Sequence, residues 1–259
     1  MSRRSALVTG GGTGIGAAVA RRLAADGFAV AVCGRRSQPL GQVAAEIDGL
    51  AVVADCRRPE AAASAVAATV ERFGRLDALV ISSGISNPGT VTEQTVDGWQ
   101  SVIDTNLTAA FLVARAALPH LLERGGAMVA VSSLSALRAG PASAAYCASK
   151  AGLNMLVQSI AVDFGPQGVR ANAVCPGWIR TDMADGAMDQ LAAAVDGDRE
   201  DAYRRVTARM PTPRPGDADE VAELVSWLLS PTAGYVNGAL IPVDGGASLL
   251  DVGMMEFQR

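Results

Sequence analysis

A tyrosine and a lysine four positions apart, Tyr146 and Lys150, have the residue types and the spacing needed to move a proton. The Ala-rich segment around them is predicted to be helical, which places positions i and i+4 on one face. A free tyrosine has a pKa of about 10, too high for efficient proton exchange near neutral pH. We expect the Lys150 ammonium to favour the phenolate and to lower the pKa of Tyr146, with a gain of roughly 3–4 kcal/mol.

Two other polar residues stand where predicted elements end or break. Ser133 follows a predicted strand, and Asn106 lies near the middle of a helix candidate, 96–122, that is too long to be read as one straight helix. Asparagine is a weak helix former, so we expect Asn106 to mark an interruption. A tyrosine–lysine pair at this spacing occurs by chance in many helices. The additional presence of Ser133 and Asn106 is what favours a catalytic role for the pair.

A glycine-rich turn follows the first predicted strand and reads Thr9-Gly10-Gly11-Gly12-Thr13-Gly14-Ile15-Gly16. Glycines at a strand-to-helix turn let the backbone approach a pyrophosphate, whose charge is met by free amides at the helix N-terminus. A tight turn without a ligand is the alternative. The position directly after the first strand favours a bound dinucleotide.

The end of the second predicted strand bears on the type of cofactor. An acidic residue there would bind a ribose 2′-hydroxyl, whereas an arginine would pair with a 2′-phosphate. The strand ends in Cys33-Gly34-Arg35-Arg36, without a carboxylate. This favours NADP(H), while NAD(H) stays open because Arg35 and Arg36 can also be solvated surface charges. Thr13 gives no further support.

Short β-branched runs alternate with longer Ala-rich segments, which predicts parallel strands joined by crossover helices. Strands are expected at 6–9, 29–33, 50–54, 78–82, 127–132, 170–174 and 239–243. Helices are expected at 15–26, 40–48, 59–73, 96–122, 145–164 and 217–229. Such strands can be apolar throughout because helices cover both faces of the sheet. We expect one α/β domain over residues 1–259, with a seven-stranded parallel sheet.

Residues 183–215 lie outside this alternation. They carry acidic and Gly-containing patches and end in a segment with Pro211, Pro213 and Pro215. We interpret them as an inserted helical flap that covers a substrate, with a surface excursion as the alternative.

The bulk properties restrict the partners. The net charge is −4 and the arginine doublets are scattered, so nucleic acid is not expected as a partner. The four cysteines are widely spaced, and His120 is the single histidine, so we expect no metal site and reduced, mostly buried thiols. The apolar stretch near the N-terminus is cut short by Gly10, so neither a signal sequence nor a membrane association is expected. We expect a cytoplasmic protein.

The motifs together resemble the short-chain dehydrogenase/reductase family over nearly the whole chain. The glycine turn resembles the family's TGxxxGxG, and Tyr146 to Lys150 resembles its YxxxK. Further matches are Asp55, the N-x-V-x-P-G-x-x-x-T stretch from Asn172 to Thr181, and Asp244-Gly245-Gly246. One departure is Ile81-Ser82-Ser83-Gly84, which replaces the family's N-N-A-G after the fourth strand and puts local side-chain support in doubt. The resemblance implies a Rossmann-type, doubly wound fold.

The resemblance also implies roles for individual residues. Ser133 would hydrogen-bond the substrate oxygen, Tyr146 would exchange the proton, and Lys150 would lower the tyrosine pKa and bind the nicotinamide ribose. Asn106 would hold the helix interruption and a water. The residues expected along the cofactor are Gly10, Thr13, Gly14, Ile15, Gly16, Arg35, Arg36, Asp55, Cys56, Gly84, Tyr146, Lys150, Pro176, Gly177, Ile179 and Thr181. The candidate walls of the substrate site are Ser135, Leu137, Arg138, Ser143, Trp178 and Met183.

The implied activity is hydride transfer between NADP(H) and a ketone or secondary alcohol, closest in character to bacterial 3-oxoacyl-thioester and polyketide ketoreductases. The substrate is a small carbonyl or alcohol compound, and a thioester-carried one is an option. An NAD-dependent dehydrogenase of a sugar, cyclitol, steroid or other secondary alcohol is the alternative enzyme. A catalytically silent dinucleotide-binding sensor or scaffold is the alternative outside enzymes. The resemblance further implies a homodimer or homotetramer.

Overall fold

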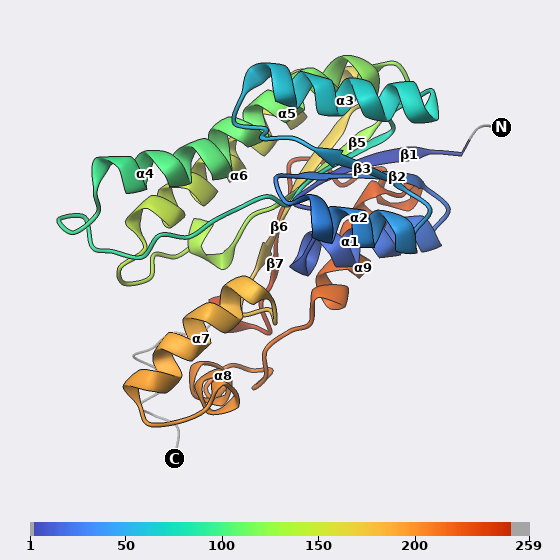
Figure 1. The fold of residues 1–259 in the computed structure, drawn as a ribbon. Helices are drawn as coiled ribbons and strands as arrows, with labels where there is room; N and C mark the ends of the chain where they lie inside the picture. The colour runs from blue at the N-terminus through green and yellow to red at the C-terminus, as the bar shows by residue number, and fades with distance from the viewer. Residues whose placement is uncertain (1–2, 250–259) are drawn as a thin grey trace.

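A single seven-stranded sheet forms the centre of the computed structural model, which describes residues 3–249 (Figure 1). Every neighbouring pair of strands is parallel, in the order β3-β2-β1-β4-β5-β6-β7. The strands are β1 Ser5–Thr9, β2 Ala29–Gly34, β3 Leu50–Val53, β4 Ala78–Ile81, β5 Ala127–Val131, β6 Arg170–Pro176 and β7 Leu240–Val243. The expected seven strands and their parallel arrangement are therefore confirmed.

Helices cover both faces of the sheet (Figure 1). One layer consists of α1 Gly14–Ala25, α2 Ser37–Glu46 and α9 Ala218–Leu229, and the other contains α3 Pro59–Phe73 and α6 Ala144–Phe164. Successive residues of a strand point to opposite faces. In β1, Ala6 and Val8 accordingly lie in the core under the first layer, whereas Leu7 lies in the core under the second. This is the Rossmann-type, doubly wound fold.

The long helix expected at 96–122 contains the irregularity that Asn106 predicts. It consists of α4 Val96–Ile103, a π-helical turn over Asp104–Thr108 and α5 Ala109–Leu122, which follow one another without a gap. A π turn inserts an extra residue and often marks a functional position. By length and composition this helix could cross a membrane. Its buried side chains, such as Val113 and Leu121, instead contribute to the core on one face of the sheet.

Two helices follow β6 and form a separate small layer, α7 Asp182–Ala194 and α8 Arg199–Thr207. Figure 1 shows them set apart from the two layers that cover the sheet. They pack on each other through a small core of their own, which contains Met188, Ala192, Ala202 and Tyr203. Two helices thus occupy most of the expected 183–215 insertion, and its role as a cover for substrate stays a prediction.

Candidate active site

A cleft of about 780 Å³ opens at the carboxyl ends of the parallel strands. Parallel strands end at the same edge, and ligands of such sheets bind where the strand order reverses, which here is between β1 and β4. The cleft is lined by all the candidate site residues named from the sequence except Asn106 and Leu137. Residues far apart in the chain, from Gly10 to Met183, are thereby brought to one place.

The glycine turn forms the floor of one end of the cleft. Gly10 has φ +66°, and a Cβ there would lie 2.8 Å from the backbone nitrogen of Ser83. Gly14 has φ +53°, and a Cβ there would lie 3.2 Å from Cγ2 of Thr181. Positive φ is costly for residues other than glycine. Side chains at these positions would therefore strain the turn and fill the space that a pyrophosphate needs.

The amides at the start of α1 face this end of the cleft. Within the described residues, Thr13 provides no capping hydrogen bond from its side chain to these amides. The Thr13 hydroxyl instead accepts a hydrogen bond of 3.1 Å from Nη2 of Arg36. A helix N-terminus without a side-chain cap suits an anion. The turn and the helix end together fit the pyrophosphate of a dinucleotide.

Two arginines follow β2 at the outer part of the cleft. Arg35 and Arg36 line both the cleft and an adjoining shallow hollow, whose other lining residues are Ser37, Gln38, Pro39 and Gln42. Arg36 reaches Thr13 across the turn, and this contact was not foreseen from the sequence. The guanidinium groups make this corner of the cleft positively charged.

Asp55 lies at the carboxyl end of β3, on the wall of the same part of the cleft. Its carboxylate accepts two short hydrogen bonds from Arg57, of 2.9 Å from Nε and 2.6 Å from Nη2. The hydrogen bonds and charge of Arg57 lower the pKa of Asp55 to about 2, against a smaller opposing effect of burial. Arg57 also lines the cleft and is not among the residues that the sequence predicts there.

The Ser133 and Tyr146 hydroxyls meet in the middle of the cleft. Ser133 lies two residues after the end of β5. Its Oγ accepts a hydrogen bond of 3.1 Å from the Ser135 amide. Tyr146 lies in the first turn of α6 and is hydrogen-bonded to the Ser133 side chain. Both residues line the cleft, so their hydroxyls can contact one oxygen of a bound molecule.

The pKa of Tyr146 does not follow the expectation from the sequence. Burial raises it above the ordinary value of about 10, the hydrogen bond with Ser133 acts against the rise, and Cys147 adds to it. The predicted lowering by Lys150 is wrong for this structure, because the pKa of Tyr146 is raised and Lys150 is not among the groups that shift it. Its Nζ lies 5.8 Å from the centroid of the Tyr146 ring and donates to the Val131 carbonyl oxygen at 2.9 Å.

Lys150 is one of the most buried charged residues, with 3% of its surface exposed. Burial lowers its pKa to about 8, with a small opposing effect of Cys175. At neutral pH most of the population is therefore still protonated. The ammonium lines the cleft on the wall next to Gly84, where a Cβ would lie 3.4 Å from Nζ.

Asn106 lies behind the cleft and not on its wall. Its Oδ1 accepts from the Ile85 amide at 2.8 Å, and its Nδ2 donates to the Ile85 carbonyl at 2.9 Å and to Oγ of Ser149 at 3.0 Å. Ser149 in turn donates to the Tyr146 carbonyl at 2.8 Å. Asn106 therefore ties the loop after β4 to the first turns of α6. This supplies part of the support that the departure at Ser82-Ser83 had put in doubt.

The wider end of the cleft contains five of the six substrate-wall candidates, namely Ser135, Arg138, Ser143, Trp178 and Met183. Leu137 is a correction, since its side chain is 41% exposed and lies outside the cleft. It is the residue that follows the short helix Leu134–Ala136, which Ser133 caps. Lining residues that were not predicted from the sequence include Ile85, Leu134, Pro141, Ala184 and Ala187. Their apolar types carry no chemical signal that could have singled them out.

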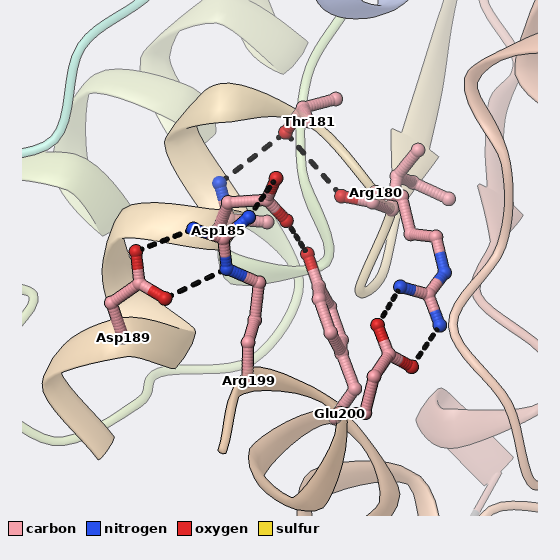
Figure 2. A network of polar contacts seen from close by, with 9 residues as sticks. Arg180, Thr181, Asp185, Asp189, Arg199 and Glu200 are labelled. Carbon is pink, nitrogen blue, oxygen red and sulfur yellow. Dashed lines mark hydrogen bonds and ion pairs between the residues drawn. The ribbon is translucent and has the colours of Figure 1, made fainter. Parts of the chain in front are cut away.

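The α7–α8 pair is fixed to the strand-end loop by a network of polar contacts (Figure 2). Arg180 forms a two-bond ion pair with Glu200, of 2.6 and 2.7 Å. Arg199 pairs with Asp189 and Asp185, and Asp185 also accepts a 2.8 Å hydrogen bond from the Tyr203 hydroxyl. Thr181, which lines the cleft, caps α7 by accepting from the Ala184 amide. The network therefore connects the position of α8 to residues at the cleft.

The chain is similar to known proteins over nearly its whole length. The sequence model of a family described as enoyl-(acyl carrier protein) reductase matches residues 10–248. The chain is 39% identical over 258 residues to Protein MoaE of Klebsiella aerogenes, covering 98% of this chain and 99% of that protein. It is 32% identical over 248 residues to meso-2,3-butanediol dehydrogenase of Serratia marcescens, covering 95% of this chain and 94% of that protein. A solved structure of a variant actinorhodin polyketide ketoreductase with NADPH superposes with a TM-score of 0.90 at 34% identity. The match covers 94% of this chain and 97% of that one.

The chain belongs to the short-chain dehydrogenase/reductase family. It is an oxidoreductase that acts on alcohols or ketones and binds a nicotinamide cofactor. Among residues 3–249, no group of three or more His, Cys, Asp or Glu side chains is placed to hold a metal ion. The hydroxyls of Ser133 and Tyr146 line the cleft and are available to a substrate oxygen.

Proposed function

We propose that the protein is an NADP(H)-dependent ketoreductase, of the kind that reduces 3-oxoacyl thioesters or ketones of secondary metabolism. The observation that carries the proposal is the Ser133–Tyr146 hydroxyl pair in the cleft. Burial raises the pKa of Tyr146, so its phenol is protonated at neutral pH. A protonated phenol is the form that can give a proton to a ketone oxygen.

In the proposed reaction, Ser133 and Tyr146 donate hydrogen bonds to the substrate carbonyl oxygen and so polarise the bond. The nicotinamide supplies the hydride when the cofactor is bound. Tyr146 then passes its proton to the oxygen that becomes the alcohol. Lys150 holds a positive charge on the cofactor side of Tyr146, and Asn106 fixes the start of α6 so that the two hydroxyls stay aligned.

The preference for NADP(H) rests on the corner formed by Arg35 and Arg36. A 2′-phosphate there would meet two guanidinium groups, and no carboxylate at the end of β2 would repel it. The relative solved with NADPH supports the same preference. A charge-assisted hydrogen bond contributes about 1.5–3 kcal/mol, which corresponds to roughly tenfold to hundredfold in affinity.

The cofactor proposal is tested by measuring binding of NADPH and NADH to the wild type and to Arg35→Ala and Arg36→Ala variants. We expect each variant to lose roughly tenfold or more in NADPH affinity while its NADH affinity changes little. Arg124→Ala, at an exposed position after α5, is the matched control and should bind both cofactors like the wild type. A wild-type preference for NADH would reject the proposal.

The reductase proposal is tested with a panel of 3-oxoacyl thioesters and cyclic ketones, by following oxidation of NADPH. Tyr146→Phe should lose about 100-fold to 10,000-fold in turnover and keep its affinity for NADPH. Tyr235→Phe is the matched control, because Tyr235 is fully exposed and does not line the cleft. Unchanged turnover in Tyr146→Phe would show that the catalytic assignment is wrong.

We also infer that copies of the chain associate through the layer that contains α5 and α6. Phe111 on α5, and Met155 and Val162 on α6, expose 46%, 62% and 74% of their surface, which is unusual for large apolar side chains on one layer. Static light scattering on the purified protein should give a dimeric or tetrameric mass, and a monomeric mass at micromolar concentration would contradict the inference.

A further inference from the structure

Two cysteines from neighbouring strands meet on the wall of the cleft. Cys33 lies on β2 and Cys56 in the turn after β3, and their Sγ atoms are 3.6 Å apart. Both residues line the cleft. Cys33 is fully buried, whereas Cys56 is half-buried and therefore open to small reagents that enter the cleft.

The backbone keeps the two sulfurs together. β2 and β3 are paired, and the pairing extends one step further through a 2.8 Å hydrogen bond from the Ala54 amide to the Gly34 carbonyl. A disulfide needs an S–S distance of about 2.05 Å, so the sulfurs must approach by about 1.5 Å. Rotations about the two side-chain bonds and a small movement of the turn can supply this approach.

We propose that Cys33 and Cys56 form a dithiol site that hydroperoxides oxidise to a disulfide, and that NADP(H) in the cleft protects it. The protection rests on the proposed function, because Asp55 and Arg57, the neighbours of Cys56, line the part of the cleft assigned to the cofactor. The dithiol itself rests only on the contact between the two sulfurs.

The two thiols are not equivalent, and the difference assigns their order of reaction. The hydrogen bond from Cys33 lowers the pKa of the Cys56 thiol, while burial and the Asp55 charge oppose the lowering. The same hydrogen bond and then burial raise the pKa of the Cys33 thiol. The more exposed Cys56 is thus also the better source of thiolate, the nucleophilic form of cysteine.

The reaction then proceeds in two balanced steps. The Cys56 thiolate attacks one peroxide oxygen, the O–O bond breaks, and the departing hydroxide takes a proton, which leaves a sulfenic acid on Cys56. The Cys33 sulfur attacks the Cys56 sulfur, an S–S bond forms and the S–O bond breaks. The hydroxyl leaves as water with the proton of Cys33. Two thiols lose two electrons in total, and one hydrogen peroxide is reduced to two waters.

Formation of the bond should weaken cofactor binding. The approach of the sulfurs draws Cys56 toward β2, and Asp55 and Arg57 move with it because they share its turn. We expect the oxidised protein to bind NADPH at least fivefold more weakly than the reduced protein. Reduction with dithiothreitol should restore the original affinity.

Peptide mapping tests the dithiol directly, since trypsin places each of the four cysteines in a different peptide. The full-length reduced protein is treated with hydrogen peroxide, unfolded in guanidinium chloride that contains N-ethylmaleimide, digested without reductant and analysed by mass spectrometry. We expect peptide 23–35 linked to peptide 37–57, with maleimide on the Cys147 and Cys175 peptides. Separate, alkylated Cys33 and Cys56 peptides, or linkage to another cysteine, would overturn the proposal.

Variants and cofactor complete the test. Cys147→Ser should form the link at the wild-type rate, and Cys56→Ser should not form it while keeping the wild-type circular dichroism spectrum. Saturating NADPH should slow linkage at least fivefold. If NADPH binds by calorimetry and gives no slowing, the protection is refuted. If NADPH does not bind and the link still forms, the proposed function fails and the dithiol stands.

Discussion

Lys150 offers a measurement of how strongly the fold perturbs a charged group. Burial lowers its pKa to about 8, against an ordinary value of about 10.4. At neutral pH the folded protein therefore carries a destabilising contribution of about 3 kcal/mol from this ammonium. Between pH 8 and 10.4 the unfolded chain binds more protons at this site than the folded one, so the stability contributed by this group rises with pH.

We predict that the difference in free energy of unfolding between the wild type and Lys150→Met changes by about 3 kcal/mol from pH 7 to pH 10.5. The free energy of unfolding of the wild type should increase relative to that of the variant as the pH rises. Loss of the hydrogen bond to the Val131 carbonyl shifts the variant's stability by a similar amount at both pH values, so it does not affect the change. Urea denaturation followed by circular dichroism measures each free energy.

A second assay observes the titration itself. Lys150 is the only lysine in the sequence, so protein labelled with ¹³C-lysine gives one side-chain Cε signal to follow against pH. The same measurements in a Tyr146→Phe background remove the neighbouring phenol as a coupled group. A folded-state pKa of about 10 or more, together with parallel stability curves for wild type and Lys150→Met, would refute the reasoning.

Two further substitutions test other parts of the structure. Gly10→Ala should lower the free energy of unfolding by about 2–4 kcal/mol in urea denaturation, because its Cβ would lie 2.8 Å from the Ser83 backbone. Gly27 also has positive φ but has open space around it, so Gly27→Ala should lower the free energy of unfolding by only about 1 kcal/mol. Tyr203→Phe removes the hydrogen bond to Asp185 and should speed amide hydrogen exchange in α7 and α8 without affecting exchange in the sheet. Arg204→Ala is the control, because its side chain is 75% exposed, and it should leave exchange unchanged. Equal losses for the two glycine variants, or no change in exchange for Tyr203→Phe, would contradict these assignments.

The strands and most helices could be predicted from the sequence because their signals are local. Apolar runs such as Leu79 and Val80 in β4 are buried on both faces, and this pattern is readable without partners. Asn106 predicted an irregular turn, since a weak helix former in a long helix is also a local signal. The form of that turn, a π turn in an uninterrupted helix, depends on the contacts of Asn106 with Ile85 and Ser149.

The electrostatic state of the site could not be predicted in the same way. Helical spacing places Tyr146 and Lys150 on one face, but it does not determine where the Lys150 ammonium points. The Val131 carbonyl of β5 accepts a hydrogen bond from this ammonium, and burial in the folded chain raises the pKa of Tyr146. The contact between Cys33 and Cys56 likewise requires knowledge of which strands are neighbours.

The separate small core between α7 and α8 has a consequence for how this enzyme can change. Met188 of α7 and Tyr203 of α8 belong to this small core and to neither of the two large cores on the faces of the sheet. Substitutions at sites without shared partners have nearly additive effects on stability. Met183, Ala184 and Ala187, on the cleft-lining side of α7, can therefore be varied with little effect on the folding of the sheet. The fold thus separates the packing of the α7–α8 layer from the packing of the sheet and its two helical layers, so sequence change in one need not propagate to the other.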